Sequence, residues 1–472
     1  MEDAILYWND VALEANKVSH STPGGEQGGP TLSSRALAIA HLSMYDAYAG
    51  AVGNPANLPP YLGNLPASPT GAAPDAAIAG GAHTALSALY PSQKQFFDTR
   101  LTQAPIIGTA SQRSDGLTFG ATVARALLAD RSGDPDAGSV GYLPSTAQDA
   151  HRVDPDNPGQ GFHAPFYGAK AKCFAVGKRH TLDKPPMHGE PSYLASLRQV
   201  RGKGIAPELA GTLPASLTRR TVDETLMGIF WAYDGTSGIG TPPRFYNQIL
   251  RAVALAKSNT LAENARLFGL ANVAMADSGI LAWEQKYHHN LWRPVLALRE
   301  HDRSLGPEAV PDNDISNDTD LGWLPLGSPR TNGTDKNFTP PFPAYPSGHA
   351  TFGAAAFHMT RLFYNVNDHR PDSLLDGMSF ISDEFNGISR DNRGTIRPRH
   401  ERNFPDGLWG MIKENSVSRI FLGVHWDFDG FVPGAGNSID LSKNIGGVPL
   451  GVSIAEDVFN GGREKGMKKS TV

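Results

Sequence analysis

Apolar side chains recur at helical spacing along most of this chain. Residues 4–18 carry such a pattern, and Ser33 and Ser34 are expected to open a second, stronger helix. The same spacing predicts further helices over residues 75–90, 91–104, 116–132, 222–235, 242–258 and 261–298. Almost no stretch shows the β-branched alternation that is typical of strands. We therefore predict an all-α fold built from packed helical bundles.

Stretches rich in Gly and Pro separate these helices. Residues 20–31 and 54–74 are predicted to be loops, and residues 131–195 are predicted to be a long loop excursion packed on a helical body. This division predicts two helical bundles within one compact unit. Residues 1–220 would form an N-terminal bundle that serves as scaffold, and residues 221–472 would form the bundle that holds the active site.

An internal similarity bears on this division. Residues 39–46 (IAHLSMYD) resemble residues 270–277 (LANVAMAD). A duplication would explain the similarity, and so would two unrelated amphipathic helices that use small residues where helices approach closely. If the chain is duplicated, the first copy lacks the chemically active residues of the second and serves as scaffold.

Composition narrows the class of protein. The chain has 472 residues, 40% of them hydrophobic and 19% charged, with a net charge of −5, which is ordinary for a globular protein. Without a basic excess or a polybasic run, the sequence points to neither nucleic acid nor a membrane surface as partner. It also lacks an apolar run long enough to span a bilayer.

The cysteine content and the first residues say little about the compartment. Cys173 is the only cysteine, which excludes an intrachain disulfide and a thiolate metal cluster. The start of the chain is acidic and amphipathic, unlike a signal peptide. A signal removed earlier would leave no trace, so a periplasmic or secreted location stays open. The sequence marks no surface for a homo-oligomer.

The most informative stretch is residues 341–359, PFPAYPSGHATFGAAAFHM. Ser347 is a natural N-cap for the Ala-rich helix that follows it. Because the first N–H groups of a helix have no intrahelical partner and the helix dipole is positive there, such an end can bind an anion. Gly348 would let the backbone approach the anion, and His349 would add a proton carrier. A capped helix with a stray histidine is the alternative.

Two cations occur near the end of the long predicted helix. Lys286 and Arg293 are seven residues apart, which is two helical turns, so both are expected on nearly the same face. Pro294 then bends or ends the helix. The residues around the cations are apolar, and buried cations are costly unless an anion meets them. The alternative is a solvated basic edge.

A third segment, residues 415–430, places Arg419 and His425 in a largely apolar run. Ser418 and His425 would share a helical face, and the long side chain of Arg419 could reach round to it. A single histidine here would more often belong to the core. One lysine, two arginines, a helix N-terminus and two histidines together favour an oxyanion cage.

These three segments resemble the signature of the vanadium-dependent haloperoxidases and of the related type 2 phosphatidic acid phosphatase superfamily. The signature is Lys, six residues and Arg-Pro; then Pro-Ser-Gly-His; then Ser-Arg, five residues, His, three residues and Asp. It is kept at Lys286 to Pro294, Pro346 to His349 and Ser418 to Asp429. FWAYDGTSGIGTPPRFYNQI, FPAYPSGHATFG, FNGISRD and SRIFLGVHW resemble the chloroperoxidase branch in particular. Residues 379–404 would then be a loop that covers the mouth of the pocket.

The resemblance implies a bound vanadate as cofactor. His425 would ligate vanadium through a ring nitrogen, and His349 would act as acid and base toward peroxide. The vanadate oxygens would be held by Lys286, Arg293, Ser347, Gly348 and Arg419. Lys286 would also polarise bound peroxide, which a halide attacks to release hypohalous acid, with vanadium acting as a Lewis acid.

The resemblance also implies supporting residues. Asp234 looks like a buried carboxylate paired with an active-site arginine, and Asp429 would orient His425 or a neighbouring cation. For both, an acid at a helix end is the alternative. Trp283 and Phe342 would form the halide pocket, whereas algal bromoperoxidases place a histidine at the second position. An apolar wall strengthens the field on the peroxide, so we predict chloride oxidation, with bromide easier.

Other features leave alternatives open. His288 and His289 depart from the chloroperoxidase pattern, which leaves the pH optimum and halide choice undecided. An acid phosphatase could use the same cage, with His425 as nucleophile and His349 as the acid for the leaving group. A non-catalytic scaffold would be expected to have lost His349, His425 or Lys286. As a haloperoxidase, the protein would use hydrogen peroxide, halide and a small organic acceptor that the sequence does not identify.

Overall fold

The computed structural model describes residues 2–55, 58–311, 318–461 and 467–472. Its helices are α1 (Ala4–Ser21), α2 (Gly29–Ala51), α3 (Pro74–Leu89), α4 (Lys94–Gln103), α5 (Ala110–Asp130), α6 (Tyr167–Lys170), α7 (Pro191–Lys203), α8 (Val222–Phe230), α9 (Pro242–Ala256), α10 (Leu261–His289), α11 (Pro294–Arg299), α12 (Gly348–Phe363), α13 (Gly407–Phe421) and α14 (Gly447–Gly461). Short 3-10 helices are η1 (Pro91–Gln93), η2 (Pro207–Thr212), η3 (Arg303–Leu305), η4 (Asp383–Phe385) and η5 (Ala435–Asn437).

The prediction of an all-α fold is confirmed. Within the described ranges the only sheet is an antiparallel pair, β1 (Ser379–Ile381) and β2 (Glu401–Asn403), which starts with Ser379 opposite Asn403. It lies in the insert that the sequence predicted to be a loop. None of the described helices has the length and apolar character needed to cross a membrane.

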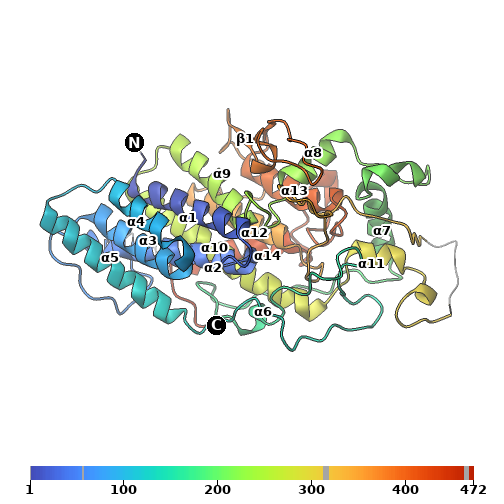
Figure 1. Cartoon of the computed structure of the whole chain (residues 1–472), viewed down its shortest axis with the longest axis horizontal. Helices are drawn as coiled ribbons and strands as arrows, with labels where there is room; N and C mark the ends of the chain where they lie inside the picture. The colour runs from blue at the N-terminus through green and yellow to red at the C-terminus, as the bar shows by residue number, and fades with distance from the viewer. Residues whose placement is uncertain (1, 56–57, 312–317, 462–466) are drawn as a thin grey trace.

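The long helix α10 runs through the middle of the molecule. Figure 1 shows helices α1 to α5 at one end, in blue to cyan, and α7, α8 and α13 at the other. Helix α10 packs against α2 on the N-terminal side and against α12 and α14 on the C-terminal side. The two sets of helices therefore meet across one shared element.

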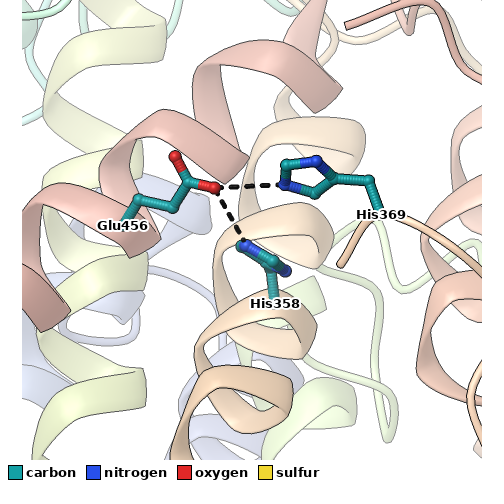
Figure 2. A group of neighbouring side chains, drawn as sticks. All are labelled: His358, His369 and Glu456. Carbon is teal, nitrogen blue, oxygen red and sulfur yellow. Dashed lines mark hydrogen bonds and ion pairs between the residues drawn. The ribbon is translucent and has the colours of Figure 1, made fainter. Parts of the chain in front are cut away.

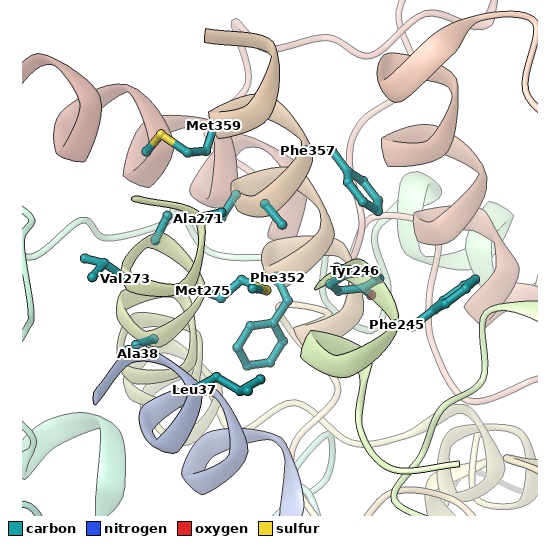
Figure 3. Close-up of a cluster of buried hydrophobic side chains, with 14 of the residues drawn as sticks. Leu37, Ala38, Phe245, Tyr246, Ala271, Val273, Met275, Phe352, Phe357 and Met359 are labelled. Carbon is teal, nitrogen blue, oxygen red and sulfur yellow. The ribbon is translucent and has the colours of Figure 1, made fainter. Parts of the chain in front are cut away.

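Buried hydrophobic side chains form one continuous core across this junction. Figure 3 shows Leu37 of α2, Met275 of α10 and Phe352 of α12 packed together, with Tyr246 of α9 beside them. Each such side chain is fully or almost fully buried, and its removal from water contributes about 1.5–3 kcal/mol. The boundary between residues 220 and 221 stays a prediction.

Two helix ends differ from the predicted ones, and both differences matter for the site. Helix α10 ends at His289 because Asn290 adopts a left-handed conformation with φ of 49°. The prediction that Lys286 and Arg293 share a helical face is therefore wrong, since Arg293 lies beyond the helix and precedes α11. Likewise α13 ends at Phe421, so His425 does not share a helical face with Ser418.

A third difference concerns the start of α2. The helix begins at Gly29, with Pro30 in its first turn, rather than at the predicted Ser33. Ser33 instead lies buried inside the helix, where its hydroxyl accepts a hydrogen bond from Asn16. The predicted loop over residues 20–31 is therefore shorter than expected. The excursion predicted over residues 131–195 ends at residue 190, because α7 begins at Pro191, and α6 is its one α-helix among the described residues.

The two similar segments hold their loops in the same way. Asp46 of α2 accepts hydrogen bonds from the backbone N–H groups of Tyr61 and Leu62. Asp277 of α10 accepts them from three consecutive N–H groups, at residues 174–176. Burial raises the pKa of both carboxyl groups, to about 7 and about 6. This shared use of a buried aspartate favours the duplication.

The N-terminus of α12 is fixed by close packing. Ser347 caps the helix as predicted, because its hydroxyl accepts from the N–H of Ala350 at 3.3 Å. Helix α14 lies so close that a Cβ at Gly447 would be 2.5 Å from the Ser347 carbonyl oxygen. A Cβ at Gly451 would lie 2.4 Å from the Thr351 carbonyl oxygen. Glycine at these positions lets α14 hold the first turns of α12 in place.

Candidate active site

The three motif segments meet at one cavity of about 240 Å³. Its walls include seven of the predicted site residues: Asp234, Trp283, Phe342, Gly348, His349, Arg419 and His425. Lys286, Arg293 and Ser347 do not line it but contact the segments that do. No residue of 379–404 lines the cavity, so the predicted cover is not formed by that insert.

Arg293 ties two of these segments together. Its Nη1 donates to the Val424 carbonyl at 2.7 Å and to Nε2 of His425 at 2.9 Å, and its Nε donates to the Phe342 carbonyl at 2.9 Å. Its Nη2 is buried, and no described residue accepts from it. Burial lowers the pKa of this guanidinium to about 9. A buried donor without an acceptor is costly and is the kind of group that an anion satisfies.

Arg419 and Asp234 form a buried ion pair. Arg419 donates through Nη2 to Asp234 Oδ1 at 2.9 Å, and both of its terminal nitrogens lie 3.1 Å from Oδ2. The exposed fractions of the two side chains are 0% and 7%. Nε of Arg419 has no acceptor within the described part of the chain. The site thus contains a second arginine with a spare buried N–H.

His425 is held as a neutral imidazole. Its Nδ1 lies 2.7 Å from Oδ2 of Asp429, an oxygen that also accepts the Trp426 N–H at 3.0 Å. Because a carboxylate only accepts, the proton of neutral His425 is on Nδ1 and the lone pair is on Nε2. Burial and the nearby Arg293 lower the pKa of His425 well below its usual value, and burial raises that of Asp429 to about 7.

His349, which also lines the cavity, has a different arrangement. Its Nε2 donates to the Ala232 carbonyl at 2.6 Å, which leaves Nδ1 as the acceptor of the neutral ring. Nε2 also lies 3.9 Å from Oδ1 of Asp234. Burial and Arg419 lower the pKa of His349 to about 3. Negative charge in the cavity would favour protonation of this ring at Nδ1.

Lys286 does not point its ammonium group into the cavity. Its Nζ donates to the carbonyl oxygens of Pro343, Ala344 and Pro346, at 2.9, 3.1 and 2.5 Å. These bonds use all three of its N–H groups. Burial and Arg293 lower its pKa well below the usual value. To bind an anion directly, Lys286 would have to exchange one carbonyl partner for it.

Trp283 and Phe342 form an aromatic wall beside these cations. Their ring centroids are 4.7 Å apart, and the Lys286 ammonium lies 5.0 Å from the Phe342 ring. A Cβ at Gly348 would lie 3.3 Å from Trp283, so only glycine leaves this backbone open next to the wall. His288 and His289 do not line the cavity, and the His289 ring packs on Tyr345.

Part of the cavity comes from the N-terminal half, which the sequence did not indicate. The contributing residues are His20, Gly29, Pro30, Gln160 and His163. They lie at the end of α1, at the start of α2 and in the 131–190 excursion, so tertiary packing alone brings them together. Their local sequence carries no spacing signal that could have identified them.

A second group of histidines lies in the second half of α12 and in the segment after it, and Figure 2 shows it. Nε2 of His358 and Nε2 of His369 lie 3.4 and 3.1 Å from the same oxygen of Glu456. Arg361 donates to Nδ1 of His358, so the proton of neutral His358 is on Nε2. The nitrogen that would have to ligate a metal is therefore a donor to Glu456. We interpret the group as a hydrogen-bonded clamp between α12 and α14.

The cavity has the donor set of an oxyanion site. Arg419, which lines the cavity, and Arg293, which lies behind His425, each carry a buried N–H without an acceptor in the described residues, and the N-terminus of α12 supplies backbone N–H groups. His425 adds an uncharged nitrogen with a lone pair. This combination fits an oxyanion whose central atom also accepts a nitrogen ligand.

Comparisons with known proteins cover nearly the whole chain. Residues 2–173 match the model of the vanadium chloroperoxidase N-terminal domain, and residues 266–448 match that of the second helical-bundle domain of the same proteins. The chain is 35% identical to the vanadium chloroperoxidase of Curvularia inaequalis over an alignment of 567 residues. That alignment covers 97% of this chain and 90% of the relative.

Solved structures with the same fold include two bacterial enzymes. A bacterial vanadium-dependent iodoperoxidase superposes with a TM-score of 0.66 at 18% identity, over 96% of each chain. The holo form of a bacterial vanadium-dependent chloroperoxidase superposes with a TM-score of 0.63 at 14% identity, also over 96% of each chain. At these identities the two structures establish a common fold.

Proposed function

The chain belongs to the vanadium chloroperoxidase family, and from this premise we propose which of its residues carry the reaction. It is a vanadium-dependent haloperoxidase, an enzyme that oxidises a halide with hydrogen peroxide to hypohalous acid. The roles below are supported by the hydrogen bonds, burial and charges of the cavity.

We propose that vanadate binds among Arg293, Arg419 and His425. The observation that carries this assignment is the pair of buried arginine N–H groups without acceptors, together with the neutral Nε2 of His425. His425 would ligate vanadium, and the oxygens would be held by Arg293, Arg419, Ser347, Gly348 and Lys286. Bound vanadate would supply a Lewis acid that activates hydrogen peroxide, and the vanadium would keep its oxidation state.

Asp429 and Asp234 prepare this site before the anion arrives. Asp429 keeps the proton of His425 on Nδ1, so Nε2 keeps its lone pair, which would have to exchange the Arg293 N–H for vanadium on ligation. Asp234 holds the guanidinium of Arg419 in one orientation through two-pronged hydrogen bonding. Preorganised donors of this kind need no rearrangement when charge develops on the anion.

His349 is the residue that moves the proton. In the vanadate-free cavity its pKa is about 3, lowered by burial and by Arg419, so the ring is neutral. An anion bound beside it raises that pKa, because negative charge favours the imidazolium. Nδ1 can then accept a proton from incoming hydrogen peroxide and return it later in the cycle.

Trp283 and Phe342 exclude water from one side of the cavity. Beside this apolar wall the dielectric constant is lower than in water, so the electric field of the neighbouring cations is screened less. We infer that this wall permits the oxidation of chloride, with bromide easier because it gives up electrons more readily.

The first experiment measures halogenation of a diketone probe by the vanadate-free protein with hydrogen peroxide, in bromide and in chloride. We expect activity to appear on adding orthovanadate and to fade with excess phosphate, which competes for the same donors. Bromination without any chlorination at mildly acid pH would contradict the chloride assignment. No response to vanadate, together with hydrolysis of a phosphomonoester, would reassign His425 as a phosphatase nucleophile.

A further inference from the structure

His163 comes from the N-terminal half and reaches the aromatic wall. Its carbonyl oxygen accepts from Nε1 of Trp283 at 3.3 Å and from the hydroxyl of Tyr287 at 2.7 Å. Its N–H donates to the Pro341 carbonyl at 2.8 Å, one residue before Phe342. The backbone of His163 is thus fixed to both segments that supply the wall, and its position relative to them is set by three hydrogen bonds.

The imidazole of His163 extends this wall into the cavity. Its ring centroid lies 6.0 Å from that of Trp283, nearly perpendicular to it, and 6.1 Å from that of Phe342. The ring lines the cavity. Gly29 makes room for it, because a Cβ there would lie 2.3 Å from Cε1 of His163 and the φ of Gly29 is +74°. The chain therefore keeps a polar ring beside two apolar ones.

Thr31 determines which nitrogen of His163 carries the proton. Oγ1 of Thr31 lies 3.1 Å from Nε2 of His163, and the Thr31 side chain is fully buried. A buried hydroxyl has one hydrogen to donate, and in the described residues Nε2 is the only acceptor in reach of it. Thr31 therefore donates to Nε2, which puts the proton of the neutral ring on Nδ1.

The Nδ1–H group is left for the cavity. No described residue pairs with Nδ1 of His163, and the atom is not sealed from solvent as the orphaned buried atoms are. His20, the other histidine on this side, differs because its Nδ1 bonds the Asn16 carbonyl and its Nε2 accepts the Gly29 N–H. Burial lowers the pKa of His163 to about 4, so the ring stays a neutral donor.

We propose that His163 is a halide-binding residue, whose Nδ1–H donates to a chloride or bromide ion held against Trp283 and Phe342. The proposal rests on the halide wall of the proposed function and adds a donor to it. A purely aromatic wall offers an anion no hydrogen bond in exchange for its lost water. Chloride is smaller and more strongly hydrated than bromide, so it depends more on such a donor.

Two substitutions of similar size separate the donor from the packing. In His163→Asn the amide nitrogen stands near the position of Nδ1, whereas in His163→Gln it stands near that of Nε2, toward Thr31. We expect the ratio of kcat/KM for chloride to kcat/KM for bromide to fall about tenfold in His163→Gln. In His163→Asn this ratio should stay close to that of the wild type. In Thr31→Val no hydroxyl fixes the proton of His163 on Nδ1, so the ratio should lie between those of the wild type and His163→Gln.

A simple packing role predicts the opposite order. If the ring only fills space and anchors on Thr31, His163→Gln retains the ratio and His163→Asn loses it. Equal ratios in the two variants would also overturn the proposal. His83→Asn serves as the matched control, because His83 pairs with Asp98 on α4 and does not line the cavity.

A second readout does not depend on turnover. The chain contains 15 histidines, and in ¹⁵N-histidine-labelled protein the signal of His163 is the one missing from His163→Asn. Without peroxide, in the vanadate-loaded enzyme, we expect a ring protonated on Nδ1 whose ¹⁵N shift changes as chloride is added. A ring protonated on Nε2, or a signal indifferent to chloride, would refute the proposal. Wild-type protein without vanadate-dependent halogenation would instead refute the proposed function itself.

Discussion

Arg419 directs both terminal nitrogens to Asp234, at 2.9 and 3.1 Å, while its buried Nε has no acceptor in the described residues. The pair therefore neutralises the guanidinium without using all of its donors. Asp234 supplies charge balance and orientation before the anion binds, and Nε remains available to the anion. If Arg419 pairs with Asp234 at all times and with the anion only when it is bound, several outcomes can be tested.

The first prediction concerns the stability of the vanadate-free protein. Asp234→Ala leaves Arg419 buried without its counter-charge, so we expect the free energy of unfolding to fall by about 3–5 kcal/mol. Vanadate should shrink that deficit, because the anion gives Arg419 a new partner. Urea unfolding with and without vanadate measures both quantities.

Asp372→Ala is the matched control for that experiment. It removes the buried one of the two carboxylates that pair with Arg361, another fully buried arginine, at 2.8 Å and away from the cavity, while the more exposed Asp368 stays at 3.0 Å. Vanadate should stabilise this variant and the wild type equally, so the difference between their free energies of unfolding should not change when vanadate is added. A deficit of Asp234→Ala that is equally insensitive would contradict the assignment of Arg419 to the anion.

A second prediction separates the two histidines of the cavity. His349→Ala should lower kcat by about 10²–10⁴-fold, because the proton carrier is lost, and should change the Kd for vanadate less than about tenfold. His425→Ala should instead raise that Kd, because a ligand is lost. Equilibrium dialysis of vanadate, combined with rates at saturating vanadate, distinguishes the two. His289→Ala, outside the cavity, is the control expected to change neither.

Loss of vanadate binding in His349→Ala and its retention in His425→Ala would reverse these roles. The two rings differ in their acceptor nitrogen: it is Nδ1 in His349, because Nε2 donates to the Ala232 carbonyl, and Nε2 in His425, because Nδ1 donates to Asp429. The pair of variants tests which of the two residues binds vanadate.

A third prediction tests how Asp429 prepares His425. Asp429→Asn keeps the shape of the side chain but replaces the carboxylate that accepts from Nδ1 of His425 and from the Trp426 N–H. We expect the Kd for vanadate to rise about tenfold, at the lower end of the effects of such supporting groups, with little change in secondary structure. An unchanged Kd would mean that His425 keeps its tautomer without the acid.

A fourth prediction follows from the clamp of His358, His369 and Glu456. The hydrogen bonds from His358 and His369 lower the pKa of Glu456 to about 2. Since the carboxyl pKa is about 4.3 in an unfolded chain, its contribution to stability is complete above that pH and is lost as the pH falls toward 2. The side chain is 41% exposed, so the contribution should not exceed about 1 kcal/mol.

Glu456→Gln measures this contribution directly. The difference in unfolding free energy between wild type and variant should be constant from about pH 5 to 7 and should shrink as the pH falls toward 3. Urea titrations at several pH values provide it. A difference that grew on acidification would mean that the clamp stabilises the protonated carboxyl, against the direction of the pKa shift.

The sequence predicted the identity of the cage residues better than their geometry. Ser347 caps α12 as expected, because a cap depends on neighbouring residues alone. Lys286 and Arg293 do converge, since both lie about 5 Å from the Phe342 ring, but α10 ends at the left-handed Asn290 between them. The apolar pattern continued past Asn290 to residue 298, so periodicity gave no sign of this helix end.

Other parts of the site depend on contacts that no local pattern encodes. The three carbonyl partners of Lys286 follow from the path of the Pro-rich segment over residues 343–346. His163 lies in an excursion whose Gly, Pro, Asp and His content indicates a loop but not where the loop packs. The sequence therefore indicated the residues within the three motif segments and in the WAYDG segment, but not the contribution of the N-terminal half to the cavity.

The cavity takes His20 and His163 from before residue 220 and Arg419 and His425 from after it, and this has a consequence for dividing the protein. A fragment that begins at α8 would contain every residue of the proposed anion site but would lack His163. Separately expressed halves would then be inactive toward chloride apart and active when mixed, since α2 and α10 bury their shared face only together. The residues of the proposed vanadate site would then come from the chain after residue 220, and the proposed halide donor, His163, from the chain before it.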